Sequence, residues 1–204
     1  FIMWSISPTN NPRPRLWVKW FINPFVHKKG KGAIIRRRKS RIDVFPWNQS
    51  SIGNNTIIED FTTINNGAGN IIIGNNARVG IGSVIIGPVY LGNEVGLGQH
   101  VFISGFNHGY EDGERDSNEQ ALVKKEVIID DESHIGANSV IVAGVHIGKR
   151  CQIGAGSVVT KNIPDYSVAV GNPAKIIKRY NFQNKTWERT QELVPLVNNN
   201  SNHI

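Results

Sequence analysis

The chain has 204 residues with 39% hydrophobic content, a size that fits one domain with extensions. Its single cysteine, Cys151, excludes a disulfide framework, no apolar run is long enough for a membrane span, and the first residues lack a secretory h-region, so we expect a cytoplasmic protein. The net charge of +7 suggests anionic partners, but the basic clusters lack the aromatic platform or groove-reading helix of nucleic-acid modules, so we expect small phosphorylated ligands or acidic lipid headgroups and no nucleic acid.

Residues 1–47 are interpreted as an N-terminal extension. A short amphipathic helix that stops near Pro24 is predicted, because large apolar residues fall at helical spacing: Leu16, Trp17, Trp20 and Phe21. Two roles stay open for this helix, capping the open end of the fold that follows, which we favour, and peripheral contact with a membrane surface. Residues 33–47 are predicted to form an irregular first coil.

An aliphatic residue returns at every sixth position between Ile52 and Pro164, except that the phase slips by three residues between Ile64 and Ile73 and by a longer insertion between Ile103 and Ile129. The fifteen leading residues are Ile52, Ile58, Ile64, Ile73, Val79, Ile85, Leu91, Leu97, Ile103, Ile129, Ile135, Ile141, Ile147, Ile153 and Val159. Four places after the leads stand small or β-branched residues, which we also expect to face inward: Thr56, Thr62, Ala68, Ala77, Ser83, Val89, Val95, Val101, Ser133, Ser139, Val145, Cys151 and Ser157. Glycine often follows the lead directly, which suits a corner where a side chain would crowd the turn.

A period of six does not fit a helical stripe, and it predicts an all-β fold, a parallel β-helix of hexapeptide repeats over residues 48–170. An ordinary sandwich of many short strands would not need such constant phase. Stacked coils pair the backbone of each coil with the next and align the leading residues into one core. Residues 171–204 are predicted to be a C-terminal extension that starts as a helix near residue 181 and ends as a mobile polar tail.

A long insertion, residues 104–126, interrupts the repeat. A loop that interrupts a regular solenoid is a strong candidate for function. His108 lies at its root, between Asn107 and Gly109, with acidic residues close behind. A histidine held there, with a carboxylate or carbonyl on one ring nitrogen, is suited to act as a general base near neutral pH. The alternative is an exposed loop histidine without a catalytic role.

Residues 33–180 combine the hexapeptide ladder, the insertion with its FNHGYED motif, and the run IGAGSVVTKNIPDYSVAVGNPAKIIKRY. On these features the chain resembles the left-handed β-helix O-acetyltransferases, the group of maltose, galactoside, xenobiotic and colanic-acid acetyltransferases. The resemblance implies a left-handed β-helix, a homotrimer with active sites between subunits, and acetyl-CoA as cosubstrate. The implied reaction is direct transfer of an acetyl group to a hydroxyl of a sugar or polysaccharide precursor.

Carried onto this sequence, the resemblance makes His108 the base that removes the proton of the acceptor hydroxyl. Asn107 is implied to contact the acceptor, and the carboxylate that orients His108 stays open between Glu111, Asp112 and Glu119. The implied cofactor groove follows repeat corners and ends at a basic turn whose ammonium groups approach the phosphates of CoA. Its residues are Ala137, Ala155, Thr160, Lys161, Lys175 and Lys178.

Three other functions stay open. The first is N-acyl transfer to an amino sugar. The second is a zinc enzyme like the carbonic anhydrases that share this repeat, whose trihistidine site needs a closely spaced histidine pair. His134 and His146 share the last position of their blocks but form no such pair, so we expect no metal. The third is a noncatalytic β-helix, which would leave the His108 loop without a purpose.

Overall fold

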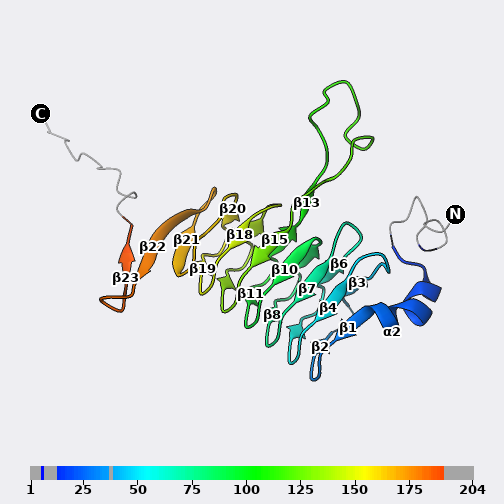
Figure 1. Ribbon diagram of the computed structural model, residues 1–204, viewed down its shortest axis with the longest axis horizontal. Helices are drawn as coiled ribbons and strands as arrows, with labels where there is room; N and C mark the ends of the chain where they lie inside the picture. Colours follow the sequence, from blue (N-terminus) through cyan, green and yellow to red (C-terminus); the bar gives the residue numbers. More distant parts are fainter. Residues whose placement is uncertain (1–5, 7–12, 37–38, 191–204) are drawn as a thin grey trace, which may run out of the picture.

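The structure is a computed structural model that describes residue 6, residues 13–36 and residues 39–190. Its main body is the predicted left-handed parallel β-helix, a stack of coils from which one long loop projects (Figure 1). Each coil contributes strands to three parallel sheets, which we name A, B and C.

Sheets A and C each hold six strands. Sheet A contains β1 (His27–Lys29), β4 (Ser50–Ile52), β7 (Ile71–Ile73), β10 (Val89–Leu91), β15 (Val127–Ile129) and β18 (His146–Ile147). Sheet C contains β3 (Arg41–Asp43), β6 (Thr63–Asn65), β9 (Val84–Ile86), β12 (Phe102–Ser104), β17 (Val140–Ile141) and β20 (Val158–Val159). A two-stranded antiparallel ribbon at the root of the long loop pairs β13 (Phe106–Asn107) with β14 (Val123–Lys124).

Sheet B has nine strands, and its last two pairings are antiparallel: β22 runs antiparallel to β21, and β23 runs antiparallel to β22. It contains β2 (Ile34–Ile35), β5 (Ile57–Ile58), β8 (Arg78–Val79), β11 (Gly96–Leu97), β16 (His134–Ile135), β19 (Gln152–Ile153), β21 (Ser167–Val170), β22 (Lys175–Asn181) and β23 (Thr186–Arg189). Parallel pairing begins with His27 opposite Ser50, so regular coils start ahead of residue 48. The division into 1–47, 48–170 and 171–204 stays a prediction.

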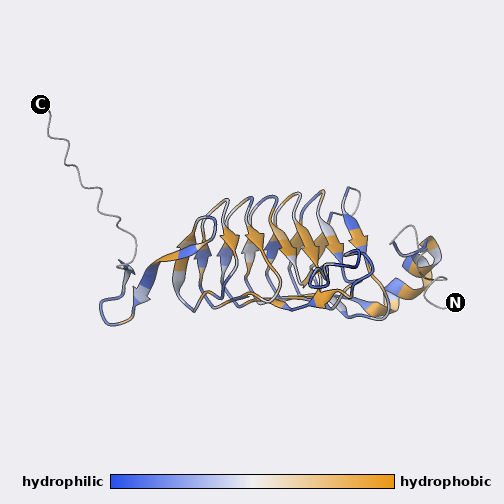
Figure 2. Cartoon of the chain, turned by 90° about the horizontal axis from the view of Figure 1, so that it is seen from above, coloured by the Kyte–Doolittle hydropathy of each residue, from blue (hydrophilic) through white to orange (hydrophobic). Residues whose placement is uncertain are grey.

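The core consists of the predicted leading residues, which are all at most 4% exposed. They stack in register from coil to coil, as Ile73 does between Ile52 and Leu91. Figure 2 shows hydrophobic strand residues recurring along the whole stack. The second inward position is also buried throughout, except at Ala68, where the prediction is wrong. There the longer turn buries Asn66 instead, whose amide bonds the backbone of Phe45.

The corner between sheets A and B is held by a ladder of side chains that repeats in successive coils. The amide N–H groups of Asn54, Asn75 and Asn93 donate to the side-chain oxygen of the next member, over 2.8, 2.9 and 2.7 Å, ending at Asp131. Glycines precede these asparagines because the coils approach closely: a Cβ on Gly74 would lie 2.5 Å from the next coil's backbone. The Gly-Asn pair that recurs at this corner therefore has a structural reason in each coil.

The N-terminal segment is helical, as predicted, and comprises the π-helix η1 (Val18–Ile22) and α2 (Asn23–Val26). Pro24 does not stop it, because it stands in the first turn of α2, where no intrahelical N–H is needed. Only Val18 of η1 is buried, and Asp43 holds the segment on the first coil through ion pairs with Arg13 and Lys19. None of the helices in the described part of the chain has the length and apolar composition that a membrane crossing requires.

The predicted C-terminal helix is wrong, because residues after 181 form a turn and β23. Two aromatic side chains explain the hairpin, since Tyr180 and Trp187 face each other across β22 and β23 with ring centroids 5.4 Å apart. The carboxamide oxygen of Asn181 accepts the N–H groups of Gln183 and Asn184 in the turn. The predicted mobile tail from 191 onward lies outside the described residues.

Candidate active site

The long loop leaves the β-helix after sheet C and places His108 at its root. The ribbon of β13 and β14 fixes the two ends of the loop, and Lys125 N donates to Gly105 O over 2.8 Å. At Gly109 the two sides approach so closely that a Cβ would lie 2.7 Å from Gln120 Cβ. His108 itself is exposed, and its ring meets Phe106 edge to face at 5.7 Å. The imidazole is thus held at a defined place and remains accessible.

A cavity of about 360 Å³ lies between His108 and the outer face of sheet C. Asn107 and His108 supply its polar edge together with Ser104. The walls are largely apolar and come from β9, β12, β13, β17 and the residues after it: Ile86, Phe102, Phe106, Val140, Ile141, Val142 and Ala143. The structure therefore brings together the two predicted site residues at the loop root, next to a pocket that can take a small ligand.

The three carboxylates predicted as partners of His108 lie farther out on the loop and are exposed. Asp112 accepts a hydrogen bond from Glu114 N at 3.1 Å, and Arg115 Nη2 donates to Glu119 O at 2.8 Å. Throughout residues 13–36 and 39–190, the structure shows no hydrogen bond or ion pair from Glu111, Asp112 or Glu119 to His108. The orienting role of these groups stays a prediction.

Ala137 and Ala155 occupy successive coils at the corner between sheets B and C. Their coils stack tightly, since a Cβ on Gly98 would lie 2.7 Å from Ala137 N. In the part of the chain that the structure describes, the N–H groups of both alanines have no acceptor, whereas the corresponding corner between sheets A and B satisfies its amides through the asparagine ladder. Two unpaired amide donors in line can bind carbonyl oxygens of an extended ligand.

Lys175 and Lys178 are three residues apart on β22, a spacing that would normally place them on opposite faces of a strand. The strand has a bulge here, because Val168 pairs with Lys178 and Ala169 with Ile176, leaving Ile177 as the extra residue. Ala169 is buried, so its neighbours in β21, Val168 and Val170, face outward with the two lysines opposite them. Both ammonium groups consequently lie on the outer face of sheet B.

Thr160 and Lys161 are exposed directly after β20. Because β12, β17 and β20 are successive strands of sheet C, these two residues lie at the corner from which the long loop leaves, two coils farther along. No hydrogen bond or ion pair within the described ranges joins them, or Lys175 and Lys178, to His108. One chain therefore presents three separate groups of predicted site residues.

The residue before each leading residue points outward. Whether this outward residue is apolar or polar depends on the sheet, and the sequence did not lead us to predict that difference. Sheet C presents mostly apolar residues there, Val84, Phe102, Val140 and Val158 after Thr63, and sheet A presents Ile72, Tyr90 and Ile128 between Ser51 and His146. Sheet B presents exposed polar residues in three coils, Arg78, His134 and Gln152, with Ile57 and Gly96 at the same position of two others. Reading every third block together would have revealed this signal, because three blocks make one coil.

The other histidines and the cysteine of the described residues do not form a second candidate active site. Within the described residues, no three side chains of His, Cys, Asp or Glu are placed to hold a metal ion. Cys151 is fully buried, and desolvation raises the pKa of its thiol, which keeps it protonated and unsuited to nucleophilic attack. His146 pairs with Asp130 at 2.7 Å on the surface of sheet A.

Comparison with known proteins identifies relatives along most of the chain. Residues 126–161 match the hexapeptide repeat of succinyl-transferase. The galactoside O-acetyltransferase of Lactococcus lactis subsp. lactis (strain IL1403) is 31% identical over 147 residues, which cover 71% of this chain and 70% of that protein. A probable acetyltransferase of Mycobacterium tuberculosis is 33% identical, and the matched part is 69% of this chain but only 46% of that protein's length.

A short segment of 42 residues is 69% identical to the dTDP-3-amino-3,6-dideoxy-alpha-D-galactopyranose 3-N-acetyltransferase of Aneurinibacillus thermoaerophilus, covering 21% of this chain and 22% of that protein. Among solved structures, the N-acyltransferase AntD from Bacillus cereus, in complex with dTDP and 3-hydroxybutyryl-CoA, shares the fold with a TM-score of 0.66 at 22% identity, covering 79% of this chain and 87% of that one. A maltose O-acetyltransferase from Clostridium difficile 630 has a TM-score of 0.52 at 28% identity, with 74% and 68% covered.

Proposed function

Because this chain belongs to the hexapeptide-repeat acetyltransferases, we propose that it transfers the acetyl group of acetyl-CoA to a hydroxyl of a sugar or polysaccharide precursor, with His108 as general base. The observation that carries the proposal is the cavity at the loop root, where His108 and Asn107 face an apolar wall of sheet C. Such a site can hold the apolar face of a sugar ring while polar groups contact its hydroxyls.

In the proposed step, a ring nitrogen of His108 accepts the proton of the acceptor hydroxyl as its oxygen bonds to the thioester carbonyl carbon. The carbon–sulfur bond then breaks, and the protonated imidazole returns the proton to the departing sulfur. Acetyl-CoA supplies the activated acyl group, and Asn107 orients the acceptor. The exposed position of His108 suits a base that must reach a ligand bound between two surfaces.

The cofactor is proposed to lie along the corner of Ala137 and Ala155, whose unpaired N–H groups would bind the amide carbonyls of the pantetheine arm. Thr160 and Lys161, which follow β20 at the other end of that strand from Ala155, are proposed to line the groove as well, and Lys175 with Lys178 would contact the phosphates. The bulge in β22 supports the last assignment, because it places both ammonium groups on one face, as a single anionic group requires.

A homotrimer is proposed because the predicted groups of one chain do not meet. The outward rows of sheets A and C are mostly apolar, whereas that of sheet B carries Arg78, His134 and Gln152, so sheets A and C are the faces better suited to contacts with other copies. The His108 cavity borders the apolar face of sheet C, which would place the site between subunits. The cytoplasmic location likewise stays a prediction.

N-acyl transfer to an amino sugar is the second candidate, and the short segment shared with a 3-N-acetyltransferase favours it. Both reactions use the same cofactor and scaffold and differ in the acceptor atom. An amine with a free lone pair needs less help from a base than a hydroxyl, so the dependence on His108 would be weaker.

Comparing acetyl-CoA turnover of the parent chain and His108→Ala, with a panel of sugars, tests the proposal. We expect the variant to lose about a hundredfold or more in kcat, because the base is removed. His146→Ala is the matched control, since His146 is also exposed but lies on sheet A with Asp130 as its partner. Undiminished transfer by His108→Ala would remove His108 from the mechanism.

A further inference from the structure

The helical segment at the N-terminal end exposes the side that a soluble protein normally buries. Leu16, Trp20, Phe21 and Phe25 are 68%, 71%, 67% and 82% exposed, whereas Val18 on the opposite side is fully buried. Helices on the surface of a globular protein usually turn their apolar stripe to the core and their polar stripe to water. We name these four exposed residues the aromatic face of the segment.

Charge is concentrated at the same end of the molecule. The first 42 residues carry eleven of the 23 lysines and arginines and none of the 16 acidic residues. The first carboxylate, Asp43, is fully buried and is already paired with Arg13, Lys19 and Arg41. Lys28 and Lys29 are exposed directly after α2. The aromatic face is therefore flanked by a segment of the sequence that is rich in lysine and arginine and has no acidic residue before Asp43.

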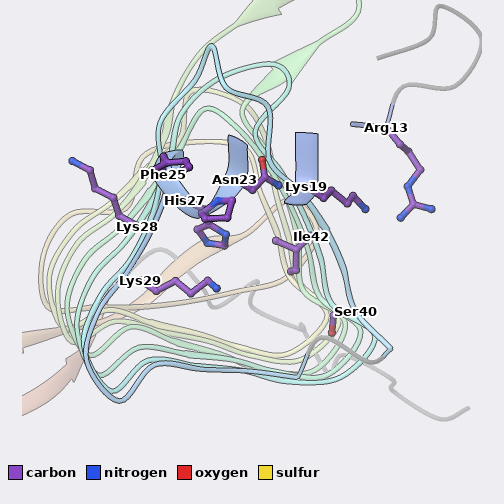
Figure 3. Close-up of a pocket in the computed structure, with 10 residues that line it drawn as sticks. Arg13, Lys19, Asn23, Phe25, His27, Lys28, Lys29, Ser40 and Ile42 are labelled. Carbon is purple, nitrogen blue, oxygen red and sulfur yellow. The ribbon is translucent and has the colours of Figure 1, made fainter. Parts of the chain in front are cut away.

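A cavity of about 740 Å³ opens between this segment and the first coil. Figure 3 shows Lys28 and Arg13 on opposite sides of the coil, with Lys29 extending across it. Asn23 Oδ1 is buried there, and no hydrogen-bond partner for it is found among the residues that the structure describes. Phe25 belongs to both the cavity lining and the aromatic face, so the apolar surface is continuous with the mouth of a cationic cavity.

We propose that this end of the β-helix binds the surface of a bilayer that contains anionic phospholipids. The aromatic face lies in the interfacial region, where tryptophan and phenylalanine rings are favoured, and the flanking cations contact lipid phosphates. The cavity gives a headgroup room between Lys28, Lys29 and Arg13. A partner protein would also cover apolar side chains, but the excess of positive charge without interspersed acids favours a uniformly anionic surface.

Vesicle flotation of the whole chain tests the proposal. We expect binding to phosphatidylcholine vesicles with about 30% phosphatidylglycerol, little binding to phosphatidylcholine alone, and loss of binding at about 0.5 M salt. Substituting Trp20→Ser, Phe21→Ser and Phe25→Ser together should lower partitioning at least about tenfold. Lys28→Glu with Lys29→Glu should lower it about tenfold through charge alone.

The matched control is Phe182→Ser, which removes a ring that is 64% exposed at the opposite end of the molecule. It should bind vesicles like the parent, and thermal unfolding of all variants checks that they fold. Failure of the parent to bind anionic vesicles, or equal binding by the triple serine variant, would overturn the proposal. Sedimentation without vesicles tests whether the aromatic face is instead a contact between copies of the chain. A lower mass for the triple serine variant than for the parent would show such a contact and would also overturn the proposal.

Discussion

A single extra residue, Ile177, decides where two predicted phosphate ligands point. Without the bulge, Lys175 and Lys178 would alternate across β22, and one of them would face the core side of the strand. The motif in the sequence shows that two lysines lie near each other along the chain, but it does not show that they share a face. That fact depends on the pairing of β22 with β21, which is a tertiary feature.

Replacing both lysines, Lys175→Ala with Lys178→Ala, tests their role. We expect the KM for acetyl-CoA to rise about tenfold or more while the KM for the acceptor changes little, because two charge-assisted contacts to phosphate are lost. Lys149→Ala is the control, since Lys149 is exposed at a corner between strands and no role is proposed for its side chain. An unchanged KM for acetyl-CoA in the double variant would place the phosphates elsewhere.

At the scale of elements, the long loop is a ribbon with a tight root and an exposed end (Figure 1). The sequence identified its limits and His108, because an insertion into a regular repeat is visible without a structure. It did not predict the pairing of β13 with β14, since neither strand is long enough to show a pattern. The sequence also did not predict the C-terminal hairpin, because the contact of Tyr180 with Trp187 depends on the turn at Asn181.

Substitutions at two glycines of the loop test whether the loop root positions His108, the proposed base. Gly109→Ala would bring a Cβ within 2.7 Å of Gln120 Cβ and 2.8 Å of Ala121 O, so the root must shift and His108 with it. We expect activity to fall about tenfold with little change in Tm, because the β-helix core is not touched.

Gly113→Ala is the matched control, since a Cβ there meets nothing within 4 Å. It should leave both activity and Tm unchanged. Equal activity of the Gly109 and Gly113 variants would show that the geometry of the loop root is not needed for transfer.

At the scale of the whole molecule, the β-helix is a three-sided prism whose faces differ. The period of six was sufficient to predict the scaffold and the buried leading residues, because the leading position faces the core in every coil. The period of six could not distinguish the three faces, because each coil contains three blocks and the outward residues of one face come from every third block. The apolar outward rows of sheets A and C became apparent only when strands were assigned to sheets. They are the physical basis of the proposed trimer.

Sedimentation tests this assembly at the level of the intact protein. The parent should have about three times the mass of the 22.6 kDa chain. Phe102→Glu, at the centre of the outward row of sheet C, should shift it toward the monomer and lower activity, because a charge would be buried in the contact. Ile57→Glu on the outer face of sheet B is the control and should remain trimeric. A parent that sediments as a monomer at catalytic concentrations would contradict the trimer.

The central claim, acetyl transfer from acetyl-CoA to a sugar hydroxyl, is tested most directly by the chemical nature of the product. The parent chain is incubated with acetyl-CoA and matched sugars that carry either hydroxyls only or one amino group, and the products are analysed by mass spectrometry before and after mild alkali. We predict a sugar that has gained one acetyl group and loses it in alkali, as an ester does. A product formed only from the amino sugars and stable to alkali, or no product at all, would contradict O-acetyl transfer.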